Sequence, residues 1–248
     1  KLLDHGVKDV FLYSGGAIMP LIDCFYNNSI KYYIGTNELS LGLSAVGYAK
    51  STGRPGICVV TSGPGLTNMV TSLTDAQNDS TPLIVLSGQV PLNAMGSLAF
   101  QECPATEITK SITKWNYCVK DVSELDYVMD EAFRVSQNGK PGSVHIDIPK
   151  CILTNDYYPG VKKWSFNKNL NDNIYNDNNF REKMDKCAFI INNSKKPILY
   201  VGKGAINYSD QITEMAKFCK IPVTTTLHGM GIFDECEDLS LKMVGMHG

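Results

Sequence analysis

The sequence predicts an α/β protein: a doubly wound parallel sheet followed by a truncated second α/β domain. Short apolar runs typical of strands recur along the chain, and helical patterns alternate with them. Several of these runs are almost entirely apolar, as strands are when helices cover both faces of a parallel sheet. The 248 residues are 43% hydrophobic, which is enough to build such a core.

The elements of the first domain can be placed along the chain. Strands are predicted at 10–13, 32–34, 57–61, 83–87 and 144–148. Helices are predicted at 38–51, 67–77 and 123–137. Ser123 is the expected capping residue of the last helix, because the acidic residue Asp126 follows three positions later.

The composition changes after the first domain, which is predicted at 1–153. Eleven of the 25 residues from 155 to 179 are Asn or Asp, a density that disfavours regular structure and predicts a linker at 154–180. The second domain is predicted at 181–248, with helices at 181–192 and 209–220 and strands at 198–201 and 223–226. These strands are too few for a complete doubly wound sheet, so this domain is expected to be truncated.

Charge and cysteine usage narrow the class of protein. The net charge of −2 gives no electrostatic reason to expect nucleic acid or a membrane as partner, and it favours a small molecule. The eight cysteines form no C-x-x-C pair and no metal-spaced cluster with histidine, which indicates a reducing, intracellular setting. We expect a cytoplasmic location; both ends of the chain look cut, so organellar targeting stays open.

Two glycine turns follow predicted strands: Gly63-Pro64-Gly65 with Asn68, and Gly202-Lys203-Gly204 with Asn207. Each resembles the start of a dinucleotide-binding fingerprint, but Asn replaces the third glycine in both. Tight turns that need glycine are an equally good interpretation. A dehydrogenase is therefore the weakest alternative.

Glu38 is the ionisable residue with the most informative surroundings. It opens a predicted helix that has no other charge for a dozen positions. Its carboxylate could simply stabilise the helix N-terminus. If this apolar helix is buried, the carboxyl group is instead suited to proton transfer. The sequence leaves both interpretations open.

Other candidates have weaker signals. Lys150 ends a buried strand and could reach solvent or an anionic substrate. His145 lies inside an apolar strand, where a structural role is favoured over a catalytic one. The run from Lys114 to Tyr117 is interpreted as ordinary packing, and no Ser-His-Asp triad can be assigned.

The chain resembles the thiamine diphosphate-dependent enzymes, and within them the acetolactate synthase (acetohydroxyacid synthase) catalytic subunit. The residues that carry this resemblance are Tyr13-Ser14-Gly15-Gly16-Ala17, Glu38 with Gly47-Tyr48-Ala49, Thr61 to Asn68, Gly88-Gln89-Val90-Pro91, Ala99-Phe100-Gln101-Glu102, Thr113 to Asn116, Gly139 to Gly142, Asp147-Ile148-Pro149-Lys150 and Leu241 to Gly248. The resemblance implies a pyrimidine-binding domain joined to a partial FAD-binding domain.

The implied activity belongs to branched-chain amino acid biosynthesis. Pyruvate is decarboxylated, and the two-carbon unit condenses with a second 2-ketoacid to give acetolactate or acetohydroxybutyrate. In the family, the residue matching Glu38 bonds a pyrimidine nitrogen and promotes removal of the thiazolium C2 proton. The resemblance also implies a homodimer or homotetramer, a regulatory subunit in some members, and Mg²⁺.

The resemblance assigns further residues to three groups. Thiamine diphosphate would contact Tyr13, Gly15, Gly16, Thr61, Pro64, Asn68 and Gln101. The substrate channel would contain Phe100, Lys114 and Lys150. FAD would contact Lys140, Gly202, Lys203, Gly204, Thr226, Leu227, Gly245, Met246 and His247.

Some positions depart from the family pattern. Asn37 stands where members usually have His, and Lys140 stands where they usually have Arg, which binds a flavin nucleotide differently. The Gly-Asp-Gly segment that holds Mg²⁺ and the diphosphate does not occur in these residues. The chain should therefore contain half of a cofactor site and be inactive alone. Another thiamine diphosphate-dependent decarboxylase and a non-catalytic relative remain as alternatives.

Overall fold

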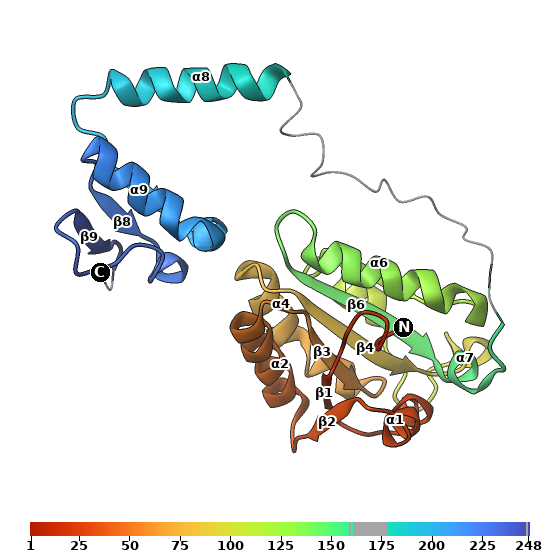
Figure 1. The fold of residues 1–248 in the computed structure, drawn as a ribbon. Coiled ribbons are helices and arrows are strands. Elements are labelled where there is room, and N and C mark those ends of the chain that lie inside the picture. Colours follow the sequence, from red (N-terminus) through yellow and green to blue (C-terminus); the bar gives the residue numbers. More distant parts are fainter. Residues whose placement is uncertain (159, 161–177, 247) are drawn as a thin grey trace. The chain divides into compact units, whose positions relative to one another are not determined.

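The structure, a computed structural model, describes residues 1–158, 160, 178–246 and 248 (Figure 1). The chain divides into two compact units, Lys1–Asn171 and Asp172–Gly248, and each has its own parallel sheet. Most of the linker predicted at 154–180 lies outside the described residues. The domain limits 1–153 and 181–248 stay predictions.

The first unit is built on a six-stranded sheet with the order β2-β1-β3-β4-β6-β5. Its strands are β1 Asp9–Leu12, β2 Lys31–Ile34, β3 Gly56–Val60, β4 Leu83–Gln89, β5 Trp115–Cys118 and β6 Ser143–Pro149. All neighbouring strands run parallel. The predicted α/β class with a parallel sheet is thus confirmed.

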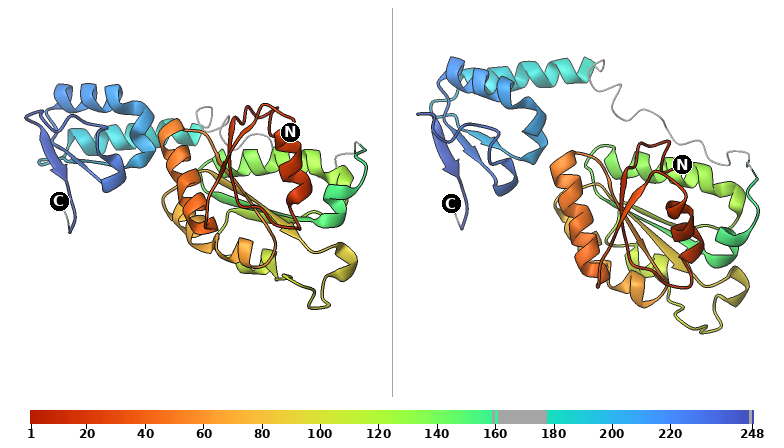
Figure 2. Two further views of the ribbon diagram at one scale, coloured as in Figure 1. Left: turned by 90° about the horizontal axis from the view of Figure 1, so that it is seen from below. Right: turned by 60° about the horizontal axis from the view of Figure 1, so that its bottom comes forward.

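Helices cover both faces of this sheet (Figures 1 and 2). They are α1 Met19–Tyr26, α2 Glu38–Thr52, α3 Pro64–Thr67, α4 Val70–Asn78, α5 Ala105–Thr109, α6 Leu125–Gln137 and α7 Lys150–Thr154. One face packs against α1 and α6, and the other against α2 and α4. Short 3₁₀ helices lie at Leu92–Ala94 and Val122–Glu124.

The strands are apolar because successive residues enter two different cores. In β3, Ile57 and Val59 pack into the core beneath α6, whereas Cys58 and Val60 pack into the core beneath α2. Every residue of β3 is therefore buried. A strand with two covered faces loses the polar alternation that marks a half-exposed strand.

Two local predictions need correction, and one strand was missed. The predicted helix 67–77 is two helices, α3 and α4, which meet at Asn68 and Met69. Ser123 is not the cap of α6: Asp121 Oδ1 accepts a hydrogen bond from Ser123 N at 2.9 Å and begins a 3₁₀ turn before the helix. Strand β5 was not predicted, because its edge position leaves Trp115, Asn116 and Tyr117 half-buried.

The second unit has a three-stranded parallel sheet in the order β7-β8-β9. Its elements are α8 Asn178–Asn192, β7 Leu199–Val201, a 3₁₀ helix Lys203–Tyr208, α9 Ser209–Cys219, β8 Val223–Thr225, a 3₁₀ helix Leu227–Gly229 and β9 Ser240–Met243. The core contains Val201, Ala216, Val223, Ile232 and Phe233. The structure thus contains all four predicted elements and adds β9.

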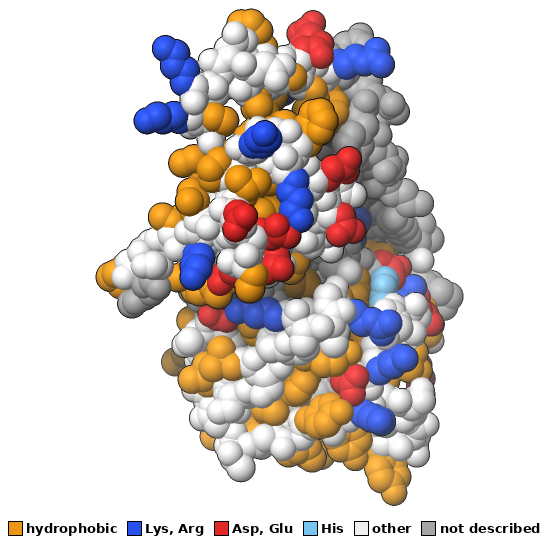
Figure 3. Space-filling model, turned by 60° about the vertical axis from the view of Figure 1, so that its left-hand side comes forward, with side chains coloured by type: hydrophobic (Ala, Val, Ile, Leu, Met, Phe, Trp, Pro, Cys, Tyr) orange, Lys and Arg blue, Asp and Glu red, His pale blue; other side chains and the backbone are white. Residues whose placement is uncertain are grey.

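The surface mixes charged and hydrophobic side chains, with both signs of charge present on the face shown in Figure 3. This mixture agrees with the near-neutral net charge of −2. Among the described residues, the search for a helix with the length and hydrophobicity of a membrane span finds none.

Candidate active site

The candidate site lies at the point of the sheet where the order in which the chain adds strands reverses. The chain places β2 on one side of β1 and β3 on the other, so β1 and β3 form a topological switch point. Ligands of open parallel sheets bind at such a point, outside the carboxyl ends of the strands. Tyr13 to Gly16 follow β1, and Thr61 to Gly65 follow β3. Except for Lys140, which lies between α6 and β6, the predicted cofactor residues of the first unit lie in these turns or near them.

The turns at this edge approach one another closely at glycine residues, where a side chain would not fit. A Cβ atom at Gly15 would lie 2.4 Å from the Thr61 Cβ, so only glycine lets the turn after β1 approach the end of β3. Gly63 has a φ of +58°, and a Cβ there would lie 2.6 Å from the Gln101 carbonyl oxygen. The turns after β1, β3 and β4 therefore form one continuous surface.

The hydroxyl group of Thr61 has an unusual environment on this surface. Thr61 Oγ1 is buried and has no hydrogen-bond partner among the described residues. The position of a Gly15 Cβ would be 2.5 Å from this oxygen, so the hydroxyl group lies directly beside the glycine turn. An unpaired buried hydroxyl group is costly, and a bound ligand is one way to satisfy it.

Glu38 is the first residue of α2, and it is both at a helix N-terminus and buried. Its side chain is 8% exposed, and Asn68 Nδ2 donates a hydrogen bond to Glu38 Oε2 at 2.9 Å. Asn68 follows α3, so the end of the glycine turn holds the carboxyl group in place. Glu38 thus meets the structural condition of each interpretation, the helix N-terminus for one and burial for the other, and its role in proton transfer stays a prediction.

Asn37 caps α2 and fixes the start of the helix. Its Oδ1 accepts hydrogen bonds from Leu39 N at 2.8 Å and Ser40 N at 3.4 Å. The side chain that stands at the usual position of a family histidine therefore points its oxygen at the helix end. Its role in this structure is to position the first turn of α2, which contains Glu38.

We expect Asn37→Ala to lower the free energy of unfolding by about 1 kcal/mol, because two helix amides lose their acceptor. Urea denaturation monitored by circular dichroism measures this change. Asn37→Ser retains a capping oxygen and should lose only a few tenths of a kcal/mol. An alanine variant as stable as the serine variant would contradict the capping role.

The predicted substrate-channel residues do not all lie at this edge. Lys150 is exposed and follows β6 directly, at the carboxyl edge, and Phe100 is 88% exposed on the segment after β4. Lys114 precedes β5, so it lies at the opposite edge, where its ammonium group donates to the carbonyl oxygens of Val135 and Asn138. Burial lowers its pKa. Lys114 is therefore not brought together with Lys150 and Phe100 in this structure, and its place in the substrate channel stays a prediction.

In the second unit, the predicted FAD residues follow the three strands. Gly202 and Lys203 follow β7, Thr226 and Leu227 follow β8, and Gly245 lies two residues after β9. Gly229 approaches this edge closely, since a Cβ there would be 3.2 Å from Thr226 Oγ1. Gly204 and Met246 belong to the same segments. His247 lies outside the described residues, and Lys140 is exposed in the first unit.

A buried polar network crosses β4 and β6 beneath the candidate site. Ser87 Oγ donates to Asp147 Oδ1 at 2.6 Å and lies 2.7 Å from His145 Nε2, and Thr109 Oγ1 lies 2.9 Å from His145 Nδ1. Burial lowers the pKa of His145 to about 3, so the ring is neutral. Burial raises the pKa of Asp147 to about 6 despite the bonds from Ser87 and Gln89. From the sequence, a structural role was predicted for His145 alone, and the network around it was not predicted.

This serine, histidine and aspartate do not form a catalytic triad. The three side chains are at most 1% exposed, so no substrate reaches the serine. The single hydroxyl hydrogen of Ser87 is donated to the aspartate, whereas a nucleophilic serine donates to the histidine. The network is part of the protein interior.

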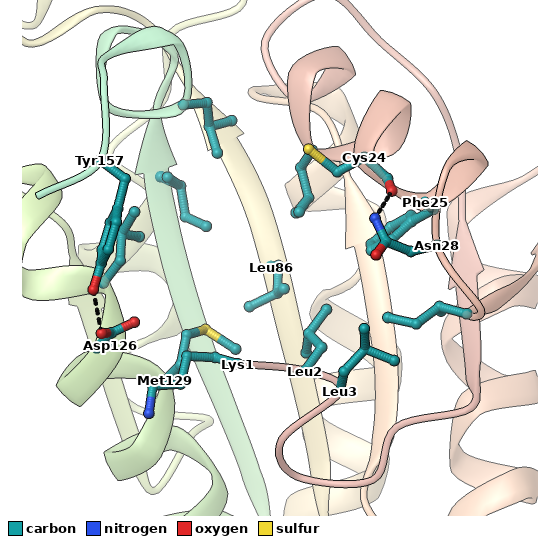
Figure 4. Close-up of a pocket in the computed structure, with 15 residues that line it drawn as sticks. Lys1, Leu2, Leu3, Cys24, Phe25, Asn28, Leu86, Asp126, Met129 and Tyr157 are labelled. Carbon is teal, nitrogen blue, oxygen red and sulfur yellow. Dashed lines mark hydrogen bonds between the residues drawn. The ribbon is translucent and has the colours of Figure 1, made fainter. Parts of the chain in front are cut away.

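A cavity of about 360 Å³ lies on the α1 and α6 face of the sheet (Figure 4). Its lining is mainly apolar, with Leu2, Leu86 and Met129 around it, and Tyr157 Oη donates to Asp126 Oδ2 at one side. None of the predicted cofactor or substrate residues lines it. The cavity is therefore separate from the candidate active site.

Comparisons with known proteins agree with this architecture. Residues 1–108 match the "Thiamine pyrophosphate enzyme, N-terminal TPP binding domain", and residues 184–248 match the "Thiamine pyrophosphate enzyme, central domain". The first match includes the whole glycine-turn surface and Glu38. The chain belongs to the thiamine pyrophosphate (thiamine diphosphate) enzymes, as the resemblance predicted.

Within this family, the chain is similar to acetolactate synthases. It is 42% identical to the mitochondrial acetolactate synthase catalytic subunit of Saccharomyces cerevisiae, over 98% of this chain and 37% of that protein. It is 41% identical to the chloroplastic acetolactate synthase of Arabidopsis thaliana, over 98% of this chain and 36% of that protein. The chain thus spans just over a third of the length of these relatives.

Proposed function

We propose that the protein is a thiamine diphosphate-dependent carboligase. It decarboxylates pyruvate and joins the two-carbon unit to a second 2-ketoacid, giving acetolactate or acetohydroxybutyrate. The observation that carries this proposal is the buried Glu38 carboxyl group, held by Asn68 at the switch point of the sheet. Similarity to acetolactate synthases of fungi and plants supports it independently.

The residues present fit the pyrimidine end of thiamine diphosphate. A pyrimidine offers ring nitrogens and an exocyclic amine, which need a carboxyl group and small hydrogen-bonding groups nearby. Glu38 supplies the carboxyl group, Thr61 supplies an unpaired hydroxyl group, and Gly15 leaves room that a side chain would fill. When bound, the cofactor supplies the electron sink for decarboxylation.

In this proposal each group has a distinct role. Glu38 would exchange a proton with a pyrimidine nitrogen, and Asn68 Nδ2 holds its carboxyl group. Tyr13, Gly16, Pro64 and Gln101 would form the surrounding surface. Phe100 and Lys150, which are exposed, would face the substrate. An ammonium group such as that of Lys150 attracts the carboxylate of a 2-ketoacid. Mg²⁺ would be held by residues outside this chain.

The carboxyl edge of the second unit is proposed to bind FAD, through the segments that follow β7, β8 and β9. Thr225 Oγ1 is buried there without a partner among the described residues, so a polar ligand would satisfy it.

The mitochondrial and chloroplastic names of the relatives favour an organellar setting and give no support to the cytoplasm. A homodimer or homotetramer and a regulatory subunit remain part of the proposal.

Product analysis tests the proposed reaction. We expect the full-length protein to convert pyruvate to acetolactate in the presence of Mg²⁺ and thiamine diphosphate, and residues 1–248 alone to form no product. Release of acetaldehyde without acetolactate would instead identify a decarboxylase. Acetolactate formed by residues 1–248 alone would show that the half-site interpretation is wrong.

A further inference from the structure

The segment from Gly96 to Cys103, which follows β4, is held in place by residues outside it. This segment contains Phe100 and Gln101, so the inference rests on the proposed function. Leu98 and Gln101 have φ values of +60° and +59°, a left-handed conformation that side chains rarely adopt. Surrounding contacts must therefore maintain this conformation.

One set of contacts lies inside the segment itself. Glu102 accepts hydrogen bonds from Gly96 N and, at 3.0 Å, from Ala99 N. These bonds close the loop on itself but do not attach it to the sheet. The attachment has to come from residues outside the segment.

The Gln89 side chain supplies that attachment at the end of β4. Its Nε2 donates to the Cys103 carbonyl oxygen at 3.1 Å and to Asp147 Oδ2 at 2.9 Å. Its Oε1 accepts from Val90 N at 2.9 Å. Both amide hydrogens and the amide oxygen are thus used in a side chain that is 1% exposed.

Asp147 determines which way this amide points. If the Gln89 amide turned over, its oxygen would face the Asp147 carboxylate and the Cys103 carbonyl group, which are both acceptors. The carboxylate therefore selects the orientation that binds Cys103. Ser87 fixes the other carboxylate oxygen at 2.6 Å, so Asp147 is itself held firmly.

We propose that Asp147 is a positioning residue which, through the Gln89 amide, anchors the Cys103 carbonyl group and thereby the segment that presents Phe100 and Gln101 to the substrate. The Gln101 carbonyl group also packs against Gly63, so the anchored segment borders the glycine turn after β3. Asp147 lies beneath the site and reaches the substrate only through this chain of contacts.

Hydrogen–deuterium exchange of the backbone amides at 96–103 tests the proposal without any need for activity. We expect Asp147→Ala and Gln89→Met to raise exchange in this segment at least tenfold, with β3 exchange unchanged. Asp147→Asn should restore slow exchange, because an asparagine oxygen still accepts from Gln89. Gln89→Met gives the answer if Asp147→Ala does not fold.

Ser136→Ala is the matched control. It removes a fully buried hydroxyl group that donates to Phe133 O within α6. Wild-type exchange at 96–103 in folded Asp147→Ala and Gln89→Met would overturn the proposal, as would equal acceleration in Ser136→Ala. In the full-length protein, Asp147→Ala should lower kcat/KM for pyruvate at least tenfold, and Asp147→Asn should restore it. An inactive wild type would refute the proposed function, but it would leave the exchange result intact.

Discussion

Replacing Glu38 by Gln is expected to lower kcat by about 10²–10⁴-fold in the full-length protein, the range for loss of a general acid–base group. The amide keeps the shape of the carboxyl group and can still accept the hydrogen bond from Asn68 Nδ2. It cannot exchange a proton near neutral pH. The fold should therefore persist while catalysis fails, which steady-state kinetics and thermal unfolding measure together.

Glu124→Gln provides a control of similar burial. Glu124 is 5% exposed, immediately precedes α6, and accepts hydrogen bonds from the Tyr117 hydroxyl group and from Lys120 N. The same exchange of carboxylate for amide should there leave kcat within about threefold of wild type, since the residue has no role in proton transfer. Unchanged turnover in Glu38→Gln would refute the catalytic assignment.

The sequence predicts best those elements whose burial repeats along the chain. The strand β3 is buried on both faces, and its five residues form an unmistakable apolar run. The two edge strands, β2 and β5, are less buried than β3, and only β2 was predicted. All four residues of β2 are exposed, but Tyr32 to Ile34 still have strand-forming side chains, whereas Trp115 to Cys118 in β5 mix polar and apolar residues. The strand β5 therefore gave no clear pattern.

Long-range pairing explains what the sequence did not show of the site. The sheet register pairs Ser87 with Asp147, although they lie 60 residues apart. Polar residues at alternate positions of β4 and β6 are the signal that could have identified this network: Ser87 and Gln89 on one strand, His145 and Asp147 on the other. In contrast, Glu38 could be identified because its signal, an isolated charge opening an apolar helix, is local.

Asp147→Asn is expected to stabilise the protein relative to wild type as pH rises. Burial raises the pKa of Asp147 from 3.8 to about 6, so between these pH values the folded state holds a proton that the unfolded state has released. The stability contributed by this proton is present below pH 4 and is lost as pH rises through about 6. The shift corresponds to about 3 kcal/mol.

Urea denaturation of wild type and Asp147→Asn at pH 4 and pH 8 isolates this contribution. All other titratable groups are present in both proteins, so their effects cancel in the comparison. Unfolding free energies should be similar at pH 4, and the variant should gain about 3 kcal/mol relative to wild type by pH 8. A difference that stays constant across this range, or one that favours wild type at pH 8, would show that Asp147 does not carry this buried charge.

The same variant should reverse the hydrogen bonds around His145. In wild type above pH 7, Ser87 donates its only hydroxyl hydrogen to Asp147, so neutral His145 must donate from Nε2 and accept at Nδ1. Thr109 Oγ1 lies 2.9 Å from Nδ1 and 3.1 Å from the Ala105 carbonyl oxygen, and in this tautomer its single hydrogen turns from Ala105 to Nδ1. Asparagine donates to Ser87 instead, whose hydroxyl group then turns to His145 Nε2 and moves the ring hydrogen to Nδ1. Nitrogen-15 chemical shifts of the imidazole distinguish these tautomers. The Nε2–H form in both proteins would contradict the donor assignment, because Ser87 would then have to accept from both neighbours and its own hydrogen would lose its acceptor.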